Sequence, residues 1–167
     1  MASEPFGEPR TVKEAMSRDD WPEWKKAIEH ELGALEKYGT WSLVPKPDGV
    51  NVVGSCWVFR LKHNACGDIE RYRARLVAQG FTQIYGVDFL DTFAPVAKLS
   101  SIRVILTLAA RFDWELEQMD VKSAYLNGEL DETIYMRQPP GFEVRGSKDK
   151  VCKLQKTLYG LKQAGRQ

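Results

Sequence analysis

Two strand-like segments, residues 57–62 and 69–79, are separated by a loop of only six residues, and this spacing constrains the fold more than any other feature. The loop contains Asn64, Gly67 and Asp68, which favour turns, so we predict an antiparallel β-hairpin. Side chains alternate along a strand, so the second segment has two different faces. One face holds Tyr72, Ala74, Leu76 and Ala78, and the other holds Arg71, Arg73, Arg75 and Val77. The arginine-bearing face suits either a solvated surface or contact with phosphate groups.

Two segments that flank the hairpin in sequence have the pattern of helices. The first begins with two acidic residues and a proline at 19–22 and ends at Tyr38 and Gly39. Its apolar stripe, at helical spacing, consists of Trp24, Ile28, Leu32 and Leu35. The second is expected over 102–111, with Ser100 and Ser101 as its cap. Because this second helix is apolar on most sides, we predict that it is buried.

Shorter strands are expected at 40–44, 134–136 and 151–154, whereas residues 80–99 have the composition of a loop. Residues 114–119 alternate between apolar and polar side chains, so we predict a strand that ends at Asp120, followed by a helical turn around Ala124 and Tyr125. A strand end holds a carboxylate rigidly, although many such aspartates only cap the next helix. The order of elements predicts an α+β fold, with the antiparallel β-hairpin and the helices packed on a mixed sheet.

Composition and charge narrow the class of protein. The 167 residues are enough for one core or two small lobes, and no apolar run has the length of a membrane span. The three cysteines lie far apart and the two histidines stand alone, so we expect reduced thiols, no zinc site and an intracellular protein. The net charge of +1 hides a local −5 over 108–144 and +6 over 145–167. This distribution suits either solvated faces or a metal-binding centre beside a phosphate-binding surface.

Several short motifs occur in a fixed order. They are WVFRLK at 57–62, RYRARLVAQGFTQ at 71–83, DTFAPV at 91–96, QMDVKSAYLNG at 118–128, IYMRQPPGF at 134–142 and LYGLKQA at 158–164. Together they closely resemble the reverse transcriptase of copia-type LTR retrotransposons, from about Pro9 to the last residue. The resemblance implies an RNA-directed DNA polymerase with a right-hand fold: a fingers-like region over 11–99 and a partial, truncated palm over 100–167. Residues 1–10 are polar and include Pro5 and Pro9, so we expect them to be disordered.

The resemblance also implies catalytic residues. Nucleotidyl transfer uses two divalent ions held by carboxylates, and Mg²⁺ prefers oxygen ligands. Asp120 matches the first metal aspartate of the family, and the backbone carbonyl of Val121 would be a second ligand. Tyr125 matches the aromatic residue under the sugar of the incoming nucleotide, where a 2′-hydroxyl would collide with the ring.

Further side chains are expected to contact the nucleotide. Arg73 and Arg75 are candidates for the triphosphate, because the arginine fork matches phosphate oxygens, and the pattern does not decide between them. Lys62 would add a charge nearby, and Gln163 is the candidate polar contact in the LYGLKQA motif. The family more often has lysine where Arg73 stands and proline where Gly165 stands.

The remaining carboxylates near these motifs are not expected to bind metal. We interpret Asp88 and Asp91 as turn or capping residues, and Asp131 and Glu132 as a solvated acidic pair.

The sequence contains no Tyr-x-Asp-Asp, the turn that carries the other two metal aspartates of the family. One carboxylate does not hold two ions, so we expect this polypeptide alone not to polymerise DNA. The implied partners are an RNA or DNA template-primer, a deoxynucleoside triphosphate, and the rest of the polyprotein with the second half of the palm, the thumb and RNase H. The implied location is a cytoplasmic particle or the nucleus. The alternatives are a non-catalytic nucleic-acid-binding remnant and an inert one.

Overall fold

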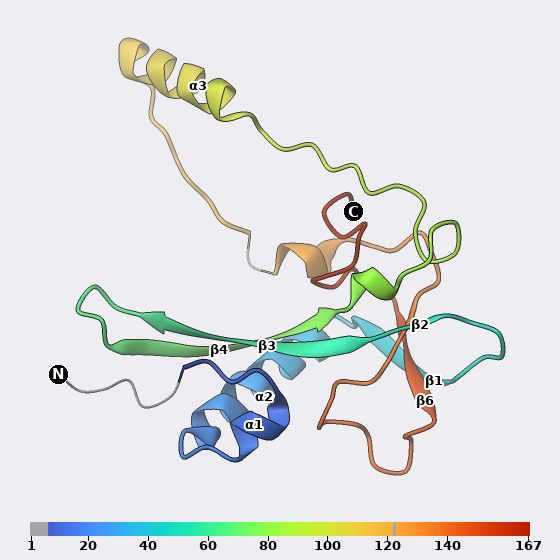
Figure 1. Cartoon of the computed structure of the whole chain (residues 1–167). Helices are drawn as coiled ribbons and strands as arrows, with labels where there is room; N and C mark the ends of the chain where they lie inside the picture. Colours follow the sequence, from blue (N-terminus) through green and yellow to red (C-terminus); the bar gives the residue numbers. More distant parts are fainter. Residues whose placement is uncertain (1–6, 122) are drawn as a thin grey trace.

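The computed structural model describes residues 7–121 and 123–167, and Figure 1 shows their arrangement. The elements in chain order are α1 (Val12–Met16), α2 (Trp21–Lys37), β1 (Trp41–Pro45), β2 (Val52–Val53), β3 (Ser55–His63), β4 (Ile69–Ala78), the 3₁₀ turn η1 (Gly80–Thr82), α3 (Leu99–Phe112), the 3₁₀ turn η2 (Ala124–Asn127), β5 (Tyr135–Met136) and β6 (Lys150–Leu154). The predicted α+β class is confirmed. No helix among the described residues is long and apolar enough to cross a membrane.

Strands β3 and β4 form the predicted antiparallel hairpin, with Trp57 opposite Leu76. The turn is closed by Asn64, whose Oδ1 accepts hydrogen bonds from the backbone N–H groups of Cys66 and Asp68, both at 2.9 Å. Alternation along β4 gives the two faces expected from the sequence, because Ala74, Leu76 and Ala78 are buried and their neighbours are partly exposed. The hairpin therefore forms from residues that are close in sequence.

Helix α2 covers the apolar face of the hairpin (Figure 1). The predicted stripe is correct, since Trp24 and Ile28 are fully buried. The Trp24 ring meets Phe59 and Tyr72 edge-on, with centroid distances of 5.1 and 4.7 Å. Edge-to-face pairs of this kind add stability beyond the area that they bury.

The second sheet has four strands in the order β1-β6-β5-β2. Adjacent strands in this sheet are antiparallel, except that β2 and β5 are parallel, so the sheet is mixed as predicted. The strands expected at 40–44, 134–136 and 151–154 correspond to β1, β5 and β6. Buried Ile134, Met136 and Cys152 belong to the same hydrophobic core as the hairpin and α2.

Helix α3 is present, but the prediction that it is buried is wrong. Ala109 is its only buried residue, and the large apolar side chains along it are more than a third exposed. The predicted cap is also wrong, because the helix begins one residue before Ser100 and Lys98 occupies the N-cap position. Figure 1 shows α3 at the end of two extended segments, away from both sheets. The helix is exposed because no sheet or helix among the described residues packs against it.

The predicted strand into Asp120 does not form. The described residues 114–121 belong to no sheet, and the side chains of Trp114, Leu116 and Met119 are 56%, 55% and 85% exposed. A strand needs a neighbouring strand to pair its backbone groups, and neither sheet offers one here. The predicted loop over 80–99 is confirmed up to residue 98, with η1 as its only helical part, but Leu99 already belongs to α3. The predicted turn at Ala124 is confirmed, because η2 begins there.

The proposed disordered N-terminus falls partly on residues 1–6, which lie outside the described residues. The chain contacts the hairpin at residue 8. The Glu8 carboxylate accepts a hydrogen bond from the Leu61 backbone N–H at 3.0 Å and pairs with Arg60.

Candidate nucleotide-binding face

The face of the hairpin opposite α2 is basic. Residues directly opposite one another in an antiparallel pair lie on the same face, and here the pairs are Lys62 with Arg71, Arg60 with Arg73 and Val58 with Arg75. Lys62, Arg73 and Arg75, the three cations predicted to meet a triphosphate, are therefore brought together on one surface. Arg60 is partly neutralised by Glu8. We refer to this surface as the basic face.

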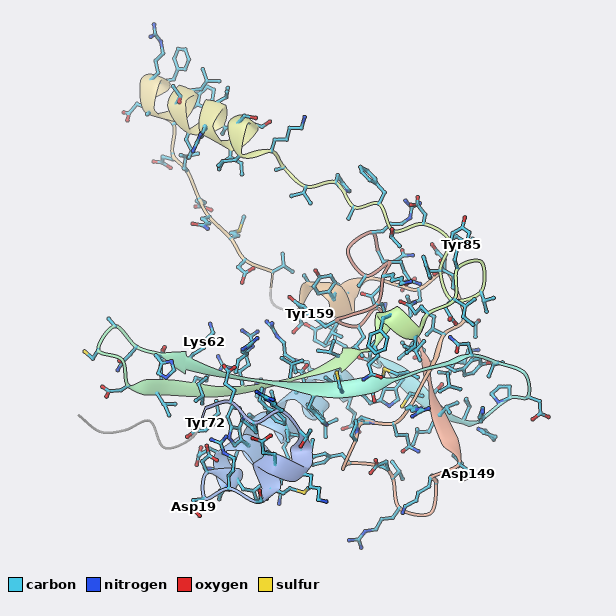
Figure 2. The ribbon with its side chains drawn as sticks, in the orientation of Figure 1. Asp19, Lys62, Tyr72, Tyr85, Asp149 and Tyr159 are labelled. Atoms are coloured by element: carbon cyan, nitrogen blue, oxygen red, sulfur yellow. The ribbon has the colours of Figure 1, made fainter. Side chains whose placement is uncertain are left out.

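Two tyrosines lie at the end of the basic face nearest Arg75. The Arg75 guanidinium lies over the Tyr159 ring, 4.8 Å from its centroid. The Tyr159 ring in turn meets Tyr125 edge-on, with a centroid distance of 4.5 Å. Figure 2 shows Tyr159 on the same side of the hairpin as Lys62, and Tyr72 on the α2 side. The fold thus joins Arg75 and Tyr125, which are far apart in sequence, through a third side chain.

Tyr159 is a residue of this site that sequence reasoning missed, although it belongs to the LYGLKQA motif. It is 43% exposed, so its ring is partly accessible beside Arg75. The available signal was an aromatic residue in the same motif as the candidate Gln163. Only the tertiary packing places the Tyr159 ring between Arg75 and Tyr125.

The backbone holds Tyr159 in place through two glycines. The Tyr159 carbonyl accepts a hydrogen bond from the Ala78 N–H at 2.7 Å, at the end of β4. A Cβ atom on Gly160 would lie 2.1 Å from the Ala78 carbonyl oxygen, and one on Gly80 would lie 2.1 Å from the Gly160 oxygen. Gly160 also has a positive φ of 91°. Both positions require glycine, because the two chain segments touch backbone to backbone.

Gln163 does not lie on the basic face. Its side chain is fully buried, where its Nε2 donates to the Asp88 carbonyl at 2.8 Å and to Glu132 Oε2 at 3.1 Å. Its Oε1 accepts from Gln83 Nε2 at 3.0 Å, and Gln83 Oε1 accepts from the Lys162 N–H at 2.8 Å. These bonds tie the loop after β4 to the segment that carries Tyr159. Gln163 is therefore buried between these two segments and does not face the basic surface.

The carboxylates near the motifs mostly have local partners. Asp88 is buried and its Oδ2 accepts from the Ile84 N–H at 2.8 Å, as expected of a turn residue. The Phe93 backbone N–H, with help from Arg166, lowers the pKa of the Asp91 carboxyl. Glu132, expected to be solvated, is half-buried by its contact with Gln163.

Asp120 and Val121 lie in the exposed segment between α3 and η2, and Val121 is 66% exposed. Among residues 7–121 and 123–167, no group of three or more His, Cys, Asp or Glu side chains could hold a metal ion. One carboxylate and one carbonyl supply two of the roughly six oxygen ligands that a single Mg²⁺ takes. Asp120 and the Val121 carbonyl would therefore supply only part of the ligand set of one cation.

Comparison with known proteins gives one family. Residues 38–167 match the model of the protein family described as "Reverse transcriptase (RNA-dependent DNA polymerase)". The Retrovirus-related Pol polyprotein from transposon TNT 1-94 of Nicotiana tabacum is 51% identical over 160 residues, which are 96% of this chain and 12% of that polyprotein. The corresponding polyprotein from transposon RE2 of Arabidopsis thaliana is 46% identical over 95% of this chain and 11% of its own length.

An uncharacterized mitochondrial protein of Arabidopsis thaliana is 41% identical over 106 residues, 64% of this chain and 61% of that protein. No solved structure matches. The chain thus spans about an eighth of the length of the plant Pol polyproteins that it resembles.

Proposed function

Since the chain belongs to the reverse transcriptase (RNA-dependent DNA polymerase) family, with relatives among copia-type plant Pol polyproteins, we propose that it supplies the nucleotide-binding part of an RNA-directed DNA polymerase. The observation that carries this proposal is the row formed by Arg75, Tyr159 and Tyr125 beside the other cations of the basic face. Positive charge beside an exposed aromatic ring suits a ligand with phosphates at one end and a sugar and base at the other.

Within this proposal, Arg75 is the better candidate for the phosphate nearest the sugar, because it alone of the candidate cations touches a ring of the tyrosine pair. Arg73 and Lys62 lie further along the same face and would meet the outer phosphates. Tyr125 would bear on the sugar and exclude a 2′-hydroxyl. Tyr159 would keep Arg75 and Tyr125 at a fixed separation.

The metal centre in this proposal is shared with residues outside the chain. Asp120 would provide a carboxylate for Mg²⁺, which stabilises the charge that develops on the transferred phosphate. The exposed apolar side chains of α3 and of 114–121 support a partner, since a surface of this kind is typical of an interface. We propose that the remainder of the polyprotein covers it and supplies the missing aspartates, so residues 1–167 alone do not polymerise.

Primer extension on an RNA template tests the proposal in a hybrid in which this chain replaces the matching residues of the tobacco polyprotein. Arg75→Gln should raise the KM for the deoxynucleotide at least tenfold. The matched change Lys37→Gln, at an exposed side chain at the end of α2, should leave this KM within twofold of the parent value. Tyr125→Ala should increase incorporation of ribonucleotides relative to deoxynucleotides. Equal effects of Arg75→Gln and Lys37→Gln, with unchanged sugar selectivity, would refute this site.

A second candidate function is non-catalytic binding of nucleic acid. The unusual concentration of cations on the basic face favours it, because binding to phosphates needs no metal centre. Chain 1–167 should then bind an oligonucleotide at low salt and release it as salt rises. Absence of binding at low salt would remove this candidate and favour an inert remnant.

A further inference from the structure

A second group of cations lies near the start of β3 and the end of β4, apart from the tyrosine pair. It surrounds an open hollow of about 640 Å³ whose wall comes from several separate parts of the chain. Lys46, Arg137, Lys148 and Lys150 contribute positive charge to this wall, and Glu143 and Asp149 contribute negative charge. Figure 2 shows Asp149 well away from Tyr159. We refer to this feature as the basic hollow.

The four cations of the basic hollow are not neutralised by its two acids. No ion pair of Lys46, Arg137, Lys148 or Lys150 occurs within the described residues, although paired surface lysines do occur elsewhere, as in Lys26 with Glu23 at 2.8 Å. The Glu143 carboxylate instead accepts from the Gly141 N–H at 3.2 Å. The hollow therefore keeps an excess of positive charge, which favours an anionic ligand.

The wall is held in shape before any ligand binds. The Gln138 side chain is 8% exposed, and its Nε2 donates to the carbonyls of Ser147 and Lys150 at 2.6 and 2.9 Å. Its Oε1 accepts from the Val144 N–H at 2.9 Å. One buried amide thus fixes the loop that carries Lys148 and Lys150. Because the backbone of this loop is already ordered, binding costs less ordering than it would for a flexible loop.

The second anchor of the wall is Ser55. Its hydroxyl lies 3.1 Å from the carbonyls of both Arg137 and Gln138, so the start of β3 is joined to the segment after β5. Gln79 also lines the hollow, one residue before the Gly80 that touches Gly160. The basic hollow is therefore continuous, through residues 79–80, with the segment that holds Tyr159.

The chemistry of the wall selects phosphates rather than bases. No aromatic ring lines the basic hollow, so it offers no stacking surface, and its cations come from three separate segments of the chain. Spaced cations without aromatic residues match the repeated charges of a sugar-phosphate backbone. A concave volume of this size suits a short stretch of one strand.

We propose that the basic hollow binds the phosphodiester backbone of a single-stranded nucleic acid, through Lys46, Arg137, Lys148 and Lys150. Resting on the proposed function, the bound strand is the unpaired template on its way to the nucleotide-binding face. The contact is independent of base sequence, since the wall reads phosphates only.

Binding of chain 1–167 to a fluorescent oligothymidylate, measured over a range of salt concentrations, tests the proposal. The triple variant Lys46→Gln, Arg137→Gln, Lys148→Gln should bind at least tenfold more weakly at low salt, and its log–log salt slope should fall by about 2, as expected for three lost contacts with a single strand. The matched control removes three exposed charges from α1 and α2 by Lys13→Gln, Lys25→Gln, Lys37→Gln, and should bind within threefold of the parent.

Equal weakening in both triple variants, or an unchanged slope in the first, would overturn the proposal, as would a preference for duplex over single strand. All six substituted side chains are exposed, so the fold should survive, and circular dichroism checks this. The assay requires no polymerase activity. Failure of Arg75→Gln to change nucleotide KM would therefore refute the proposed function and leave oligothymidylate binding as an independent result.

Discussion

The β3–β4 hairpin and the segment from α3 to Val121 are both rich in apolar residues, yet one is buried and the other is exposed. Trp57, Phe59 and Leu76 are at most 5% exposed in the hairpin. Val104, Ile105 and Leu106 in α3 are 50–58% exposed. An apolar pattern therefore determines which side chains a segment needs to bury, whereas their burial depends on another segment that can pack against them.

The hairpin finds its partners nearby. Its two strands are joined by a short turn, and only residues 38–54 separate the end of α2 from the start of β3, so the loop-closure entropy lost on pairing is modest. No such neighbour exists for α3 or for 114–121 among the described residues.

Supplying a partner should change the exposed region most. In a hybrid that continues this chain with the following region of the tobacco polyprotein, amide hydrogen exchange over 99–121 should slow by about 100-fold or more, as expected of a segment that joins a cooperative core. Exchange in β3 and β4 should hardly change. Unaltered exchange over 99–121 in a folded hybrid would show that the absence of a partner segment does not explain the exposure of these residues.

Truncation of a core side chain should separate the two regions in stability. Trp24→Ala removes a fully buried ring that contacts Phe59 and Tyr72, so we expect it to lower the free energy of unfolding by about 3–5 kcal/mol. Leu106→Ala in α3 should change it by less than about 0.5 kcal/mol, because the side chain is half exposed. Urea unfolding measures both. Comparable losses would show that α3 is packed in solution.

The glycine contact near Tyr159 gives a matched pair of substitutions. Gly160 and Gly67 have nearly equal φ values, 91° and 90°, but only at Gly160 would a Cβ atom meet another backbone, the Ala78 oxygen at 2.1 Å. Gly67→Ala should cost about 1 kcal/mol from its φ alone, and Gly160→Ala about 2–3 kcal/mol or more. Thermal unfolding compares them. Equal losses of stability in the two variants would mean that the backbone can shift at low cost where residues 78 and 160 meet.

Thiol chemistry distinguishes exposed from buried positions and gives a pH dependence. Burial raises the pKa of the Cys152 thiol from 9.0 to about 12, while Cys66 is exposed. The folded state keeps a proton that the unfolded state loses, so this contribution to stability is complete below pH 9 and falls as the pH rises towards 12. Cys66 should react with a maleimide within minutes at pH 7.5, and Cys152 only after unfolding. Rapid labelling of Cys152 in the folded protein would contradict this packing.

The smallest effect is expected at Glu31 on α2. Burial raises the pKa of its carboxyl, against the hydrogen bond from the Leu76 N–H and the charges of Arg75 and Arg73. A raised folded-state pKa contributes stability that is present below about pH 4.5 and lost as pH rises through the folded value. Glu31→Gln keeps the acceptor and removes that loss, so at pH 7 it should stabilise by about 1 kcal/mol or less. Chemical denaturation at pH 4 and 7 measures this, and a destabilised variant at pH 7 would show that the charge itself is needed.

Sequence patterns were sufficient wherever a segment met its partner locally. The apolar period of α2, the alternation along β4 and the turn residues at Asn64 and Gly67 each have one physical outcome, and each was found. The motifs also identified the family. Patterns failed at α3 and at the strand before Asp120, because hydrophobicity records a need for burial and does not supply the surface that satisfies it.

The amino-acid sequence alone is enough to specify α2, the β3–β4 hairpin, the alternation that gathers Arg73 and Arg75 on one face, and membership of the reverse transcriptase family. Only the tertiary structure decided that Tyr159 joins Arg75 to Tyr125 and that Gln163 is buried. The physical reason is that these contacts join residues about 30 to 85 positions apart. Their geometry is set by how the segments cross at Gly80 and Gly160, which no local period encodes.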